Sequence, residues 1–343
     1  MHDWSAGGKV AFRFRRVDTS TWADASDAGP LLSASVERVR GGLLESGSAE
    51  VARAVGEGFE PGYYRLSAVA EGRGLARSDV ATLYFAGGSS SVARGSETIG
   101  IEGRSVLYPA SVRRMLAGSY APEGTNGAAA ATRLLRECVA CPVEVEGAFT
   151  LNVPVIFDLG CSYLDAVWML LDAGGWCMQV SGRGAVSVKP KPTAPSSLLD
   201  ASAARALAPG VTSSLDYSGV PNAYLADDGR QSVRVVNDDP ESPTSTASRG
   251  YVHDVVDTAP KPVDGETLAA YARRKLREMS TVEDVRGYTR AYEPELRPYD
   301  VVRFSLPSQG LSGDMRITRQ SLRIGRGITV TEEACKEVAT WTA

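Results

Sequence analysis

Histidine is scarce in this chain, which has only His2 and His253 among its 343 residues. Hydrolysis by a Ser–His–Asp or Cys–His arrangement requires histidine as the base. His253 is followed by Asp254, but neighbours on a strand point to opposite faces, so these two side chains cannot pair simply. No run approaches the ~18 apolar residues of a membrane-spanning helix. We therefore favour a solvent-facing His253 and expect no membrane insertion by this chain.

An excess of positive charge is also absent. The chain has 37 Lys and Arg against 41 Asp and Glu, a net charge of −4. A protein whose main task is to neutralise phosphates clusters its Lys and Arg residues. The small cluster of Arg13, Arg15 and Arg16 is more typical of a solvated strand face. A channel that lets DNA pass without gripping it is compatible with this mildly acidic balance.

The cysteines do not form an even set, which disfavours a disulfide framework. The first residues, Met1 to Trp4, lead into polar sequence without a secretory segment, so we expect free thiols in a reducing cytoplasm. Cys138 and Cys141 form a C-x-x-C motif, which can be a redox pair or half of a zinc site. Here it falls at a helix end, where the dipole disfavours a thiolate. The five cysteines are Cys138, Cys141, Cys161, Cys177 and Cys335.

We interpret Cys138 and Cys141 as buried or incidental thiols and keep a zinc- or thiol-dependent module as the alternative. Neither Cys161 nor Cys177 has a Cys or His at short spacing that would complete a zinc site. The sequence therefore gives no catalytic, cofactor-binding or metal residue, and we expect no cofactor.

The remaining polar motifs have ordinary structural explanations. The pairs Asp227-Asp228 and Asp238-Asp239 adjoin Gly or Pro, as turn residues do, although paired carboxylates can also bind metals or cleave glycosides. The stretch from Gly87-Gly88 follows a predicted strand, but no helix pattern or lysine follows it, which excludes a phosphate-binding loop.

Both ends of the chain have β-strand patterns. Val10–Val17 alternates apolar and polar residues, with Phe12 and Phe14 on one face, as a half-buried strand does. Gly and Pro residues punctuate the gaps between such segments, which favours a sandwich or barrel. Further strands are predicted at 31–40, 49–55, 63–69, 80–85, 251–256, 288–292 and 301–306.

The middle of the chain has a different pattern. Helices are predicted at 109–116, 128–140 and 162–174, followed by a hairpin from Trp176 to Val188. The Pro-rich residues 189–195 are typical of a linker. One more amphipathic helix runs to Met279, with Asp264 as its expected N-cap.

The last long strand changes phase. Met315 and Ile317 face one way, whereas Leu322 and Ile324 face the other. A strand with a strict period of two can change phase only through an extra residue or a change of burial partner. We therefore predict a bulge or sharp coil at 319–321.

These patterns predict a mainly β chain with an α/β insertion (α+β). Two β-rich domains, each a sandwich or barrel, flank a small α/β domain. The predicted boundaries are 1–98 for the first β domain, 99–195 for the α/β domain and 196–343 for the second β domain, with an inserted helix at about 264–280.

The most informative stretch contains Tyr292, Pro294, the run Leu296-Arg-Pro-Tyr-Asp-Val-Val302, Pro307 to Gly313, and Met315 to Arg326. It resembles the C-terminal barrel of the phage tail or baseplate hub family, which includes hubs of contractile phages and of phage-like prophage elements. The segments Val220–Tyr224 and Asn237–Gly250 resemble the entry and long loop of the same barrel. The motifs of residues from about 100 to 340 match those of the family in order. The first hundred residues match only in their general pattern of short strands and turns.

The resemblance implies a structural protein without enzymatic activity. It also implies that 1–98 and 196–343 are two tube-type β-barrel domains flanking the α/β domain, so the two β-rich ends are expected to superpose. The family forms a homotrimeric, pseudo-sixfold ring that joins the sixfold tail tube to a threefold spike and lets DNA pass without specific binding. Implied partners are a tail tube or distal tail protein, a tape-measure protein and a spike or tip protein. The implied location is the virion, after assembly in the host cytoplasm, and no appended lytic domain is evident. Contractile and non-contractile tails, tailocins and injection systems all remain compatible.

Such a ring must bury surface between its subunits. Sheet edges can supply that surface by strand pairing between chains. We expect part of 288–292 or 301–306 to lie at a subunit boundary, and the channel lining to be polar and acidic.

Overall fold

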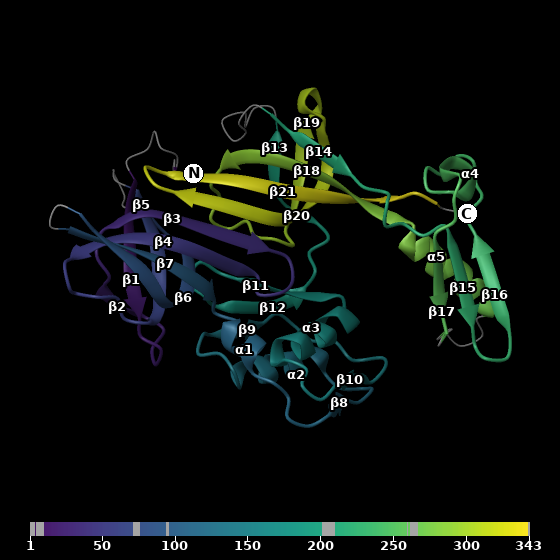
Figure 1. The fold of residues 1–343 in the computed structure, drawn as a ribbon, viewed down its shortest axis with the longest axis horizontal. Coiled ribbons are helices and arrows are strands. Elements are labelled where there is room, and N and C mark those ends of the chain that lie inside the picture. The colour runs from purple at the N-terminus through teal and green to yellow at the C-terminus, as the bar shows by residue number, and fades with distance from the viewer. Residues whose placement is uncertain are drawn as a thin grey trace. The chain divides into compact units, whose positions relative to one another are not determined.

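The computed structural model describes residues 4, 10–70, 76–93, 96–200, 210–258, 260 and 267–341 (Figure 1). The chain divides into two compact units, one formed by residues 1–211 with 287–334 and the other by 212–286 with 335–343. Two long strands, β18 (Thr281–Ala291) and β21 (Ile328–Ala339), contribute residues to both units. The predicted boundaries at 98 and 195 fall inside the first unit, and the three-domain division stays a prediction.

The first unit is built on one large sheet. Its strands follow the order β18-β21-β20-β3-β4-β7-β6-β5-β1-β2, and β19 pairs with β20 on one side and β13 on the other. Small residues and Gly-containing turns separate the strands, as the sequence predicted. The bounds are β1 Val10–Val17, β2 Asp24–Asp27, β3 Leu31–Val39, β4 Glu45–Ala54, β5 Gly62–Ala70, β6 Ala76–Ala93, β7 Ser96–Ser105, β13 Pro195–Asp200, β19 Val301–Leu306, the 3-10 turn η2 Pro307–Gln309 and β20 Leu311–Ile324.

The predicted mainly β fold with a small helical insertion is confirmed. Among the strands that the structure describes, however, no pairing joins β2 back to the far end of the order. The strands therefore form an open series of neighbours, and no closed barrel is present among them.

Strand β20 explains the predicted change of phase. Its first half, from Leu311 to Arg316, pairs with β19, and its second half, from Arg319 to Ile324, pairs with β3. Met315 and Ile317 belong to one hydrophobic cluster and Leu322 and Ile324 to another. Neither pairing contains a register shift, so β20 changes its neighbouring strand at the phase change without a bulge against β19 or β3. A sharp coil at 319–321 stays a prediction.

Within the single chain, 301–306 is not a free sheet edge. Strand β19 lies between β13 and β20 and is paired on both sides. Strand β18 has β14 (Thr212–Leu215) and β21 as neighbours. The expectation that part of 288–292 or 301–306 lies at a subunit boundary stays a prediction.

A helical layer with short strands follows β7. Helix α2 begins after Asn126, whose side chain accepts a hydrogen bond from the Ala129 amide, and it ends at Arg136. The predicted end at Ala140 is too late, because the chain turns before Pro142 and forms a short strand instead. The elements are α1 Tyr108–Val112, β8 Ser119–Ala121, α2 Gly127–Arg136, β9 Val143–Val145, β10 Val155–Phe157, α3 Tyr163–Ala173, β11 Trp176–Val180 and β12 Val186–Pro190.

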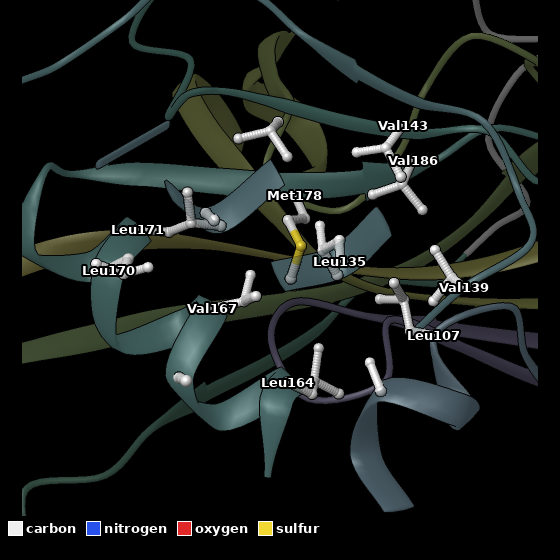
Figure 2. Packing of buried hydrophobic residues seen from close by; sticks show 14 of the residues in the cluster. Leu107, Leu135, Val139, Val143, Leu164, Val167, Leu170, Leu171, Met178 and Val186 are labelled. Carbon is white, nitrogen blue, oxygen red and sulfur yellow. The ribbon is translucent and has the colours of Figure 1, made fainter. Parts of the chain in front are cut away.

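These helices cover a small sheet of order β11-β12-β9, and β8 pairs separately with β10. Figure 2 shows how the layer is filled: Leu135 of α2 and Val167 of α3 lie close to Met178 of β11. All three are fully buried. The predicted hairpin between Trp176 and Val188 is the antiparallel pair β11–β12. This core holds the layer together by excluding water from aliphatic side chains.

The second unit contains a three-stranded sheet with a helix against it. β15 lies between β16 and β17, and Tyr224 of β15 is buried in one cluster with Tyr271 and Leu276 of α5. Thr267 caps α5 by accepting from the Ala270 amide. The predicted cap Asp264 lies outside the described residues. The elements are β15 Ala223–Asp227, β16 Ser232–Val236, α4 Thr246–Arg249, β17 Asp254–Asp257 and α5 Leu268–Met279. No helix in the described ranges is long and apolar enough to span a membrane.

Candidate functional site

The C-x-x-C motif lies in the turn that follows α2. Cys138 is half-buried and Cys141 is buried, and both are free thiols. Burial raises the pKa of Cys138 despite the nearby guanidinium of Arg113, whose Nη1 lies 3.7 Å from the sulfur. Burial also raises the pKa of Cys141 to about 12. Because the thiolate is the reactive and metal-binding form, this environment does not activate either cysteine.

Metal ligands do not gather around the motif. Among the described residues, no three His, Cys, Asp or Glu side chains are placed to hold a metal ion. Cys161 and Cys177 are also free thiols, with raised pKa values caused mainly by burial.

His253 and Asp254 make hydrogen bonds with different partners. His253 precedes β17, which begins at Asp254 and not at residue 251 as predicted, and its backbone amide donates to the side chain of Asn222 at 2.7 Å. The Asp254 carboxylate instead accepts two hydrogen bonds from Arg234, at 2.8 and 3.0 Å. The histidine thus has no carboxylate partner in Asp254. His2 lies outside the described residues.

The acidic pairs close turns. Asp228 accepts from the amides of Arg230 and Gln231, both at 2.8 Å, and these hydrogen bonds lower its pKa. Asp227 and Asp239 each accept from the amide two residues onward. Such contacts stabilise tight turns and leave these carboxylates without a converging partner.

The basic cluster on β1 and the Gly-rich stretch also have structural places. Arg15 and Arg16 pair with Asp24 and Glu60 respectively, while Arg13 is exposed. Gly87 and Gly88 lie inside β6, which runs on to Ala93, so this stretch is a strand.

The Arg-Pro-Tyr-Asp run at 297–300, directly before β19, contains a buried cation. Arg297 is 7% exposed and donates from Nε to the Val180 carbonyl at 3.2 Å. Its Nη1 donates to the carbonyls of Pro294 and Leu296, at 2.5 and 2.9 Å. Burial lowers the pKa of Arg297 to about 10, so the guanidinium remains charged at neutral pH. The side chain therefore fixes its own loop and attaches it to β11.

Asp300 completes this loop. It accepts from the Arg297 amide at 2.8 Å and from Nε2 of Gln179 at 2.9 Å, and the same nitrogen donates to the Pro298 carbonyl at 2.7 Å. Between them, Tyr299 has a left-handed φ of 80°, a conformation that side chains other than glycine rarely adopt. The Arg-Pro-Tyr-Asp run thus has the physical role of joining the large sheet to the helical layer.

A second buried polar cluster joins five strands of the large sheet. Arg38 of β3 is 1% exposed and donates to Glu45 at 2.8 Å, to Gln320 at 3.2 Å and to the Val80 carbonyl at 2.5 Å. Gln320 in turn donates to Glu332 at 2.8 Å. Because buried polar groups are costly when unpaired, this chain of contacts specifies how β3, β4, β6, β20 and β21 meet.

Glu332 is the anionic end of that cluster. Arg290 donates to it from Nε at 3.1 Å and from Nη2 at 2.6 Å, and the hydroxyl of Tyr288 donates to the same carboxylate. Both charged side chains are fully buried. The pair is saturated by protein donors, so it acts as a structural ion pair within this unit.

The β11–β12 turn packs tightly on the large sheet. Thr82 of β6 donates to the Gly182 carbonyl at 2.9 Å, and Arg65 of β5 donates to the Arg183 carbonyl at 3.1 Å. A Cβ at Gly182 would lie 1.6 Å from the Asp79 carbonyl oxygen. Only glycine allows the two backbones to approach this closely.

The sequence singled out the Arg-Pro-Tyr-Asp run at 297–300 but did not predict most of its contacts. Arg38 and Glu332 carried a signal, because each lies in phase with inward-facing residues, Ala34 and Val36 in β3 and Val330 and Ala334 in β21. Gln179 lies within a strand that is buried throughout. Polar residues in the apolar phase of a strand are the pattern that indicates such clusters.

No family model matches the sequence, and no curated protein matches it. Solved structures do match. A tail protein from Neisseria meningitidis superposes with a TM-score of 0.64 at 12% identity, over 95% of this chain and 96% of that one. The 43 kDa tail protein of prophage MuSo2 from Shewanella oneidensis gives 0.63 at 11% identity, over 94% and 96%. A chain of the Francisella PdpA–VgrG complex gives 0.55 at 7% identity, over 95% of this chain and 57% of that one.

This protein therefore has the fold of phage and prophage tail proteins, along almost the whole length of both chains. The resemblance to tail hubs inferred from the sequence is confirmed as a likeness of fold.

Proposed function

We propose that this protein is a structural component of a phage or phage-like tail tip, in which it acts as the baseplate hub. The observation that carries the proposal is the end-to-end fold match to two tail proteins, which leaves neither chain with a large unmatched domain. Fold alone does not define function. The proposal gains support from the buried polar side chains, whose hydrogen bonds hold the protein's own elements together.

The hub would be a homotrimer. The first unit supports this idea through β20, whose two halves serve two different hydrophobic clusters. If each cluster marks one barrel-like lobe, three copies supply six similar lobes. Such a ring could join a sixfold tube to a threefold spike, and the two β-rich ends should then superpose.

The proposed hub lets DNA pass and has no enzymatic activity, which fits the net charge of the chain and the environment of its thiols. A net charge of −4 favours a lumen that does not grip phosphates. The raised thiol pKa values leave the alternative module at Cys138 and Cys141 without a supporting observation.

The proposed partners are a tail tube or distal tail protein above the ring, a tape-measure protein, and a spike or tip protein below it. The fold match to a chain of the PdpA–VgrG complex supports a partner of the spike kind. The proposed location is the virion tail tip, with assembly in the host cytoplasm.

The test is the mass and shape of the purified full-length chain. Light scattering after size-exclusion chromatography should give three copies, and negative-stain images should show rings about as wide as a tail tube. Metal analysis on the same sample should find no stoichiometric zinc. A monomer at high concentration would contradict the hub, and a monomer with one zinc per chain would favour the alternative module.

A further inference from the structure

The two halves of β6 differ in their surroundings. The first half, Ala76–Phe85, is paired with β5 on one side and is mostly buried. Every residue of the second half, from Ala86 to Ala93, is exposed. In the described ranges this second half pairs only with β7, from Gly88 opposite Ile101 to Ala93 opposite Ser96. One side of its backbone therefore lies open along its length.

This free edge lacks the features that protect most natural edges. Its sequence, Ala-Gly-Gly-Ser-Ser-Ser-Val-Ala, has no charged residue and no proline. Natural proteins protect edge strands with lysines, prolines, inward charges or covering segments, because unpaired amides and carbonyls invite another strand. By contrast, the edge strand β2 carries Asp24 and Asp27. An open, uncharged edge that is otherwise hydrophilic fits an ordered strand partner better than non-specific aggregation.

We propose that the Gly87–Val92 edge of β6 accepts a strand from a second copy of this chain, and that this strand is β13. The inference rests on the proposed hub, because a closed ring requires each copy to present two different, complementary edges. Strand β13 is another edge strand of the first unit. In the described ranges it pairs only with β19, and between Pro195 at its start and Asp200 at its end it has neither a proline nor a charged residue.

The two edges also match in length and side chains. The free run of β6 and β13 each offer about six residues for a ladder. Each contributes one aliphatic side chain that the single chain leaves in water: Val92 is 59% exposed and Leu198 is 56% exposed. Pairing would satisfy the backbone donors and acceptors and cover both side chains, as in β-augmentation.

The first experiment places charge on the edge. Ser89→Lys with Ser91→Lys puts two lysines on exposed positions of the free edge, where they oppose strand pairing. The matched control is Ser46→Lys with Ser312→Lys, which adds the same charge at exposed positions of β4 and β20, strands paired on both sides. We expect the edge variant to raise the dissociation constant of the oligomer at least tenfold in analytical ultracentrifugation. The control should stay within twofold of the unmodified protein, and both should keep its circular dichroism.

The second experiment identifies the partner strand. A photo-crosslinking benzoylphenylalanine at position 90, in a mixture of unlabelled and ¹⁵N-labelled chains, should give mixed-label crosslinks to peptides containing 195–200. Crosslinks between copies to another segment would overturn β13 as the occupant. An oligomer that tolerates the edge lysines would overturn the β6 edge while leaving the hub intact. A chain that is monomeric without any substitution would overturn both proposals.

Discussion

Two arginine–carboxylate pairs bridge neighbouring strands of the same sheet in very different surroundings. Arg290 of β18 pairs with Glu332 of β21, with side chains 1% and 0% exposed. Arg303 of β19 pairs with Asp314 of β20 in a similar two-bond geometry, with side chains 56% and 38% exposed. Chemistry and spacing are nearly the same, so the comparison isolates the effect of burial.

The difference shows which charges define the fold. Both partners of the buried pair have left water, and Glu332 is held by Tyr288 and Gln320 as well as Arg290. Removing one partner leaves an uncompensated charge in a low-dielectric interior, which is far more costly than the pair is stabilising. The exposed pair exchanges its partner for water at little cost.

The largest effect is expected from breaking the buried pair. Arg290→Ala should destabilise the protein by about 3–5 kcal/mol, because Glu332 loses its cation and two donors. Urea unfolding followed by circular dichroism measures the loss. Arg290→Lys, which keeps the charge but not the planar two-bond geometry, should lose less. If Arg290→Ala is as mild as Arg303→Ala, burial is not the deciding factor.

The second-largest loss of stability is expected where two backbones pack closely, at Gly182. Gly182→Ala puts a methyl group 1.6 Å from the Asp79 carbonyl, so the β11–β12 turn must move away from β6. Overpacking of this kind costs about 1–3 kcal/mol. The control is Gly325→Ala, since a Cβ there meets nothing within 4 Å. Equal unfolding midpoints for the two variants would contradict the tight packing of the turn.

An intermediate case is Asp79, which pairs with both Arg77 and Arg183. Burial works to raise its pKa, but hydrogen bonds from Ser67 and Arg77 and the charge of Arg77 outweigh it, so the net shift is downward from 3.8. A carboxylate with a lowered folded-state pKa stabilises the fold above its unfolded pKa and loses that contribution as the pH falls through the folded value.

Stability should therefore decline below about pH 4, partly because of Asp79. Thermal unfolding from pH 7 to pH 2.5 measures this decline. Asp79→Asn should be less stable than the parent at pH 7 and should show a smaller acid-dependent loss. An identical pH profile for the two proteins would remove Asp79 from the explanation.

The smallest effect is expected at the exposed pair. Arg303→Ala should leave the unfolding midpoint unchanged within error, because solvent replaces the lost contact with Asp314. A midpoint that falls substantially, in the absence of oligomer dissociation, would show that exposure does not weaken this pair as argued.

Sequence patterns predicted a good part of the fold but few of the buried hydrogen bonds and ion pairs. Alternation identified β1 as a strand, and the hairpin of β11 and β12 was placed correctly, because both signals are local. Helix ends were less accurate: α2 ends at Arg136 and not at Ala140, and α5 is capped by Thr267. A cap depends on which side chain reaches a free amide, and several nearby residues qualify in sequence.

The sequence by itself determined the mainly β composition, the phase change along Met315–Ile324 and the unusual Arg-Pro-Tyr-Asp run, since these follow from periodicity and local residue chemistry. Only the tertiary structure decided that β20 changes neighbours between Arg316 and Arg319, because strand order depends on non-local pairing. It also decided which side chains meet Glu332 in the interior, namely Arg290, Tyr288 and Gln320. The physical reason is that these contacts depend on which distant strands lie side by side, and a residue's own neighbours in sequence do not specify that.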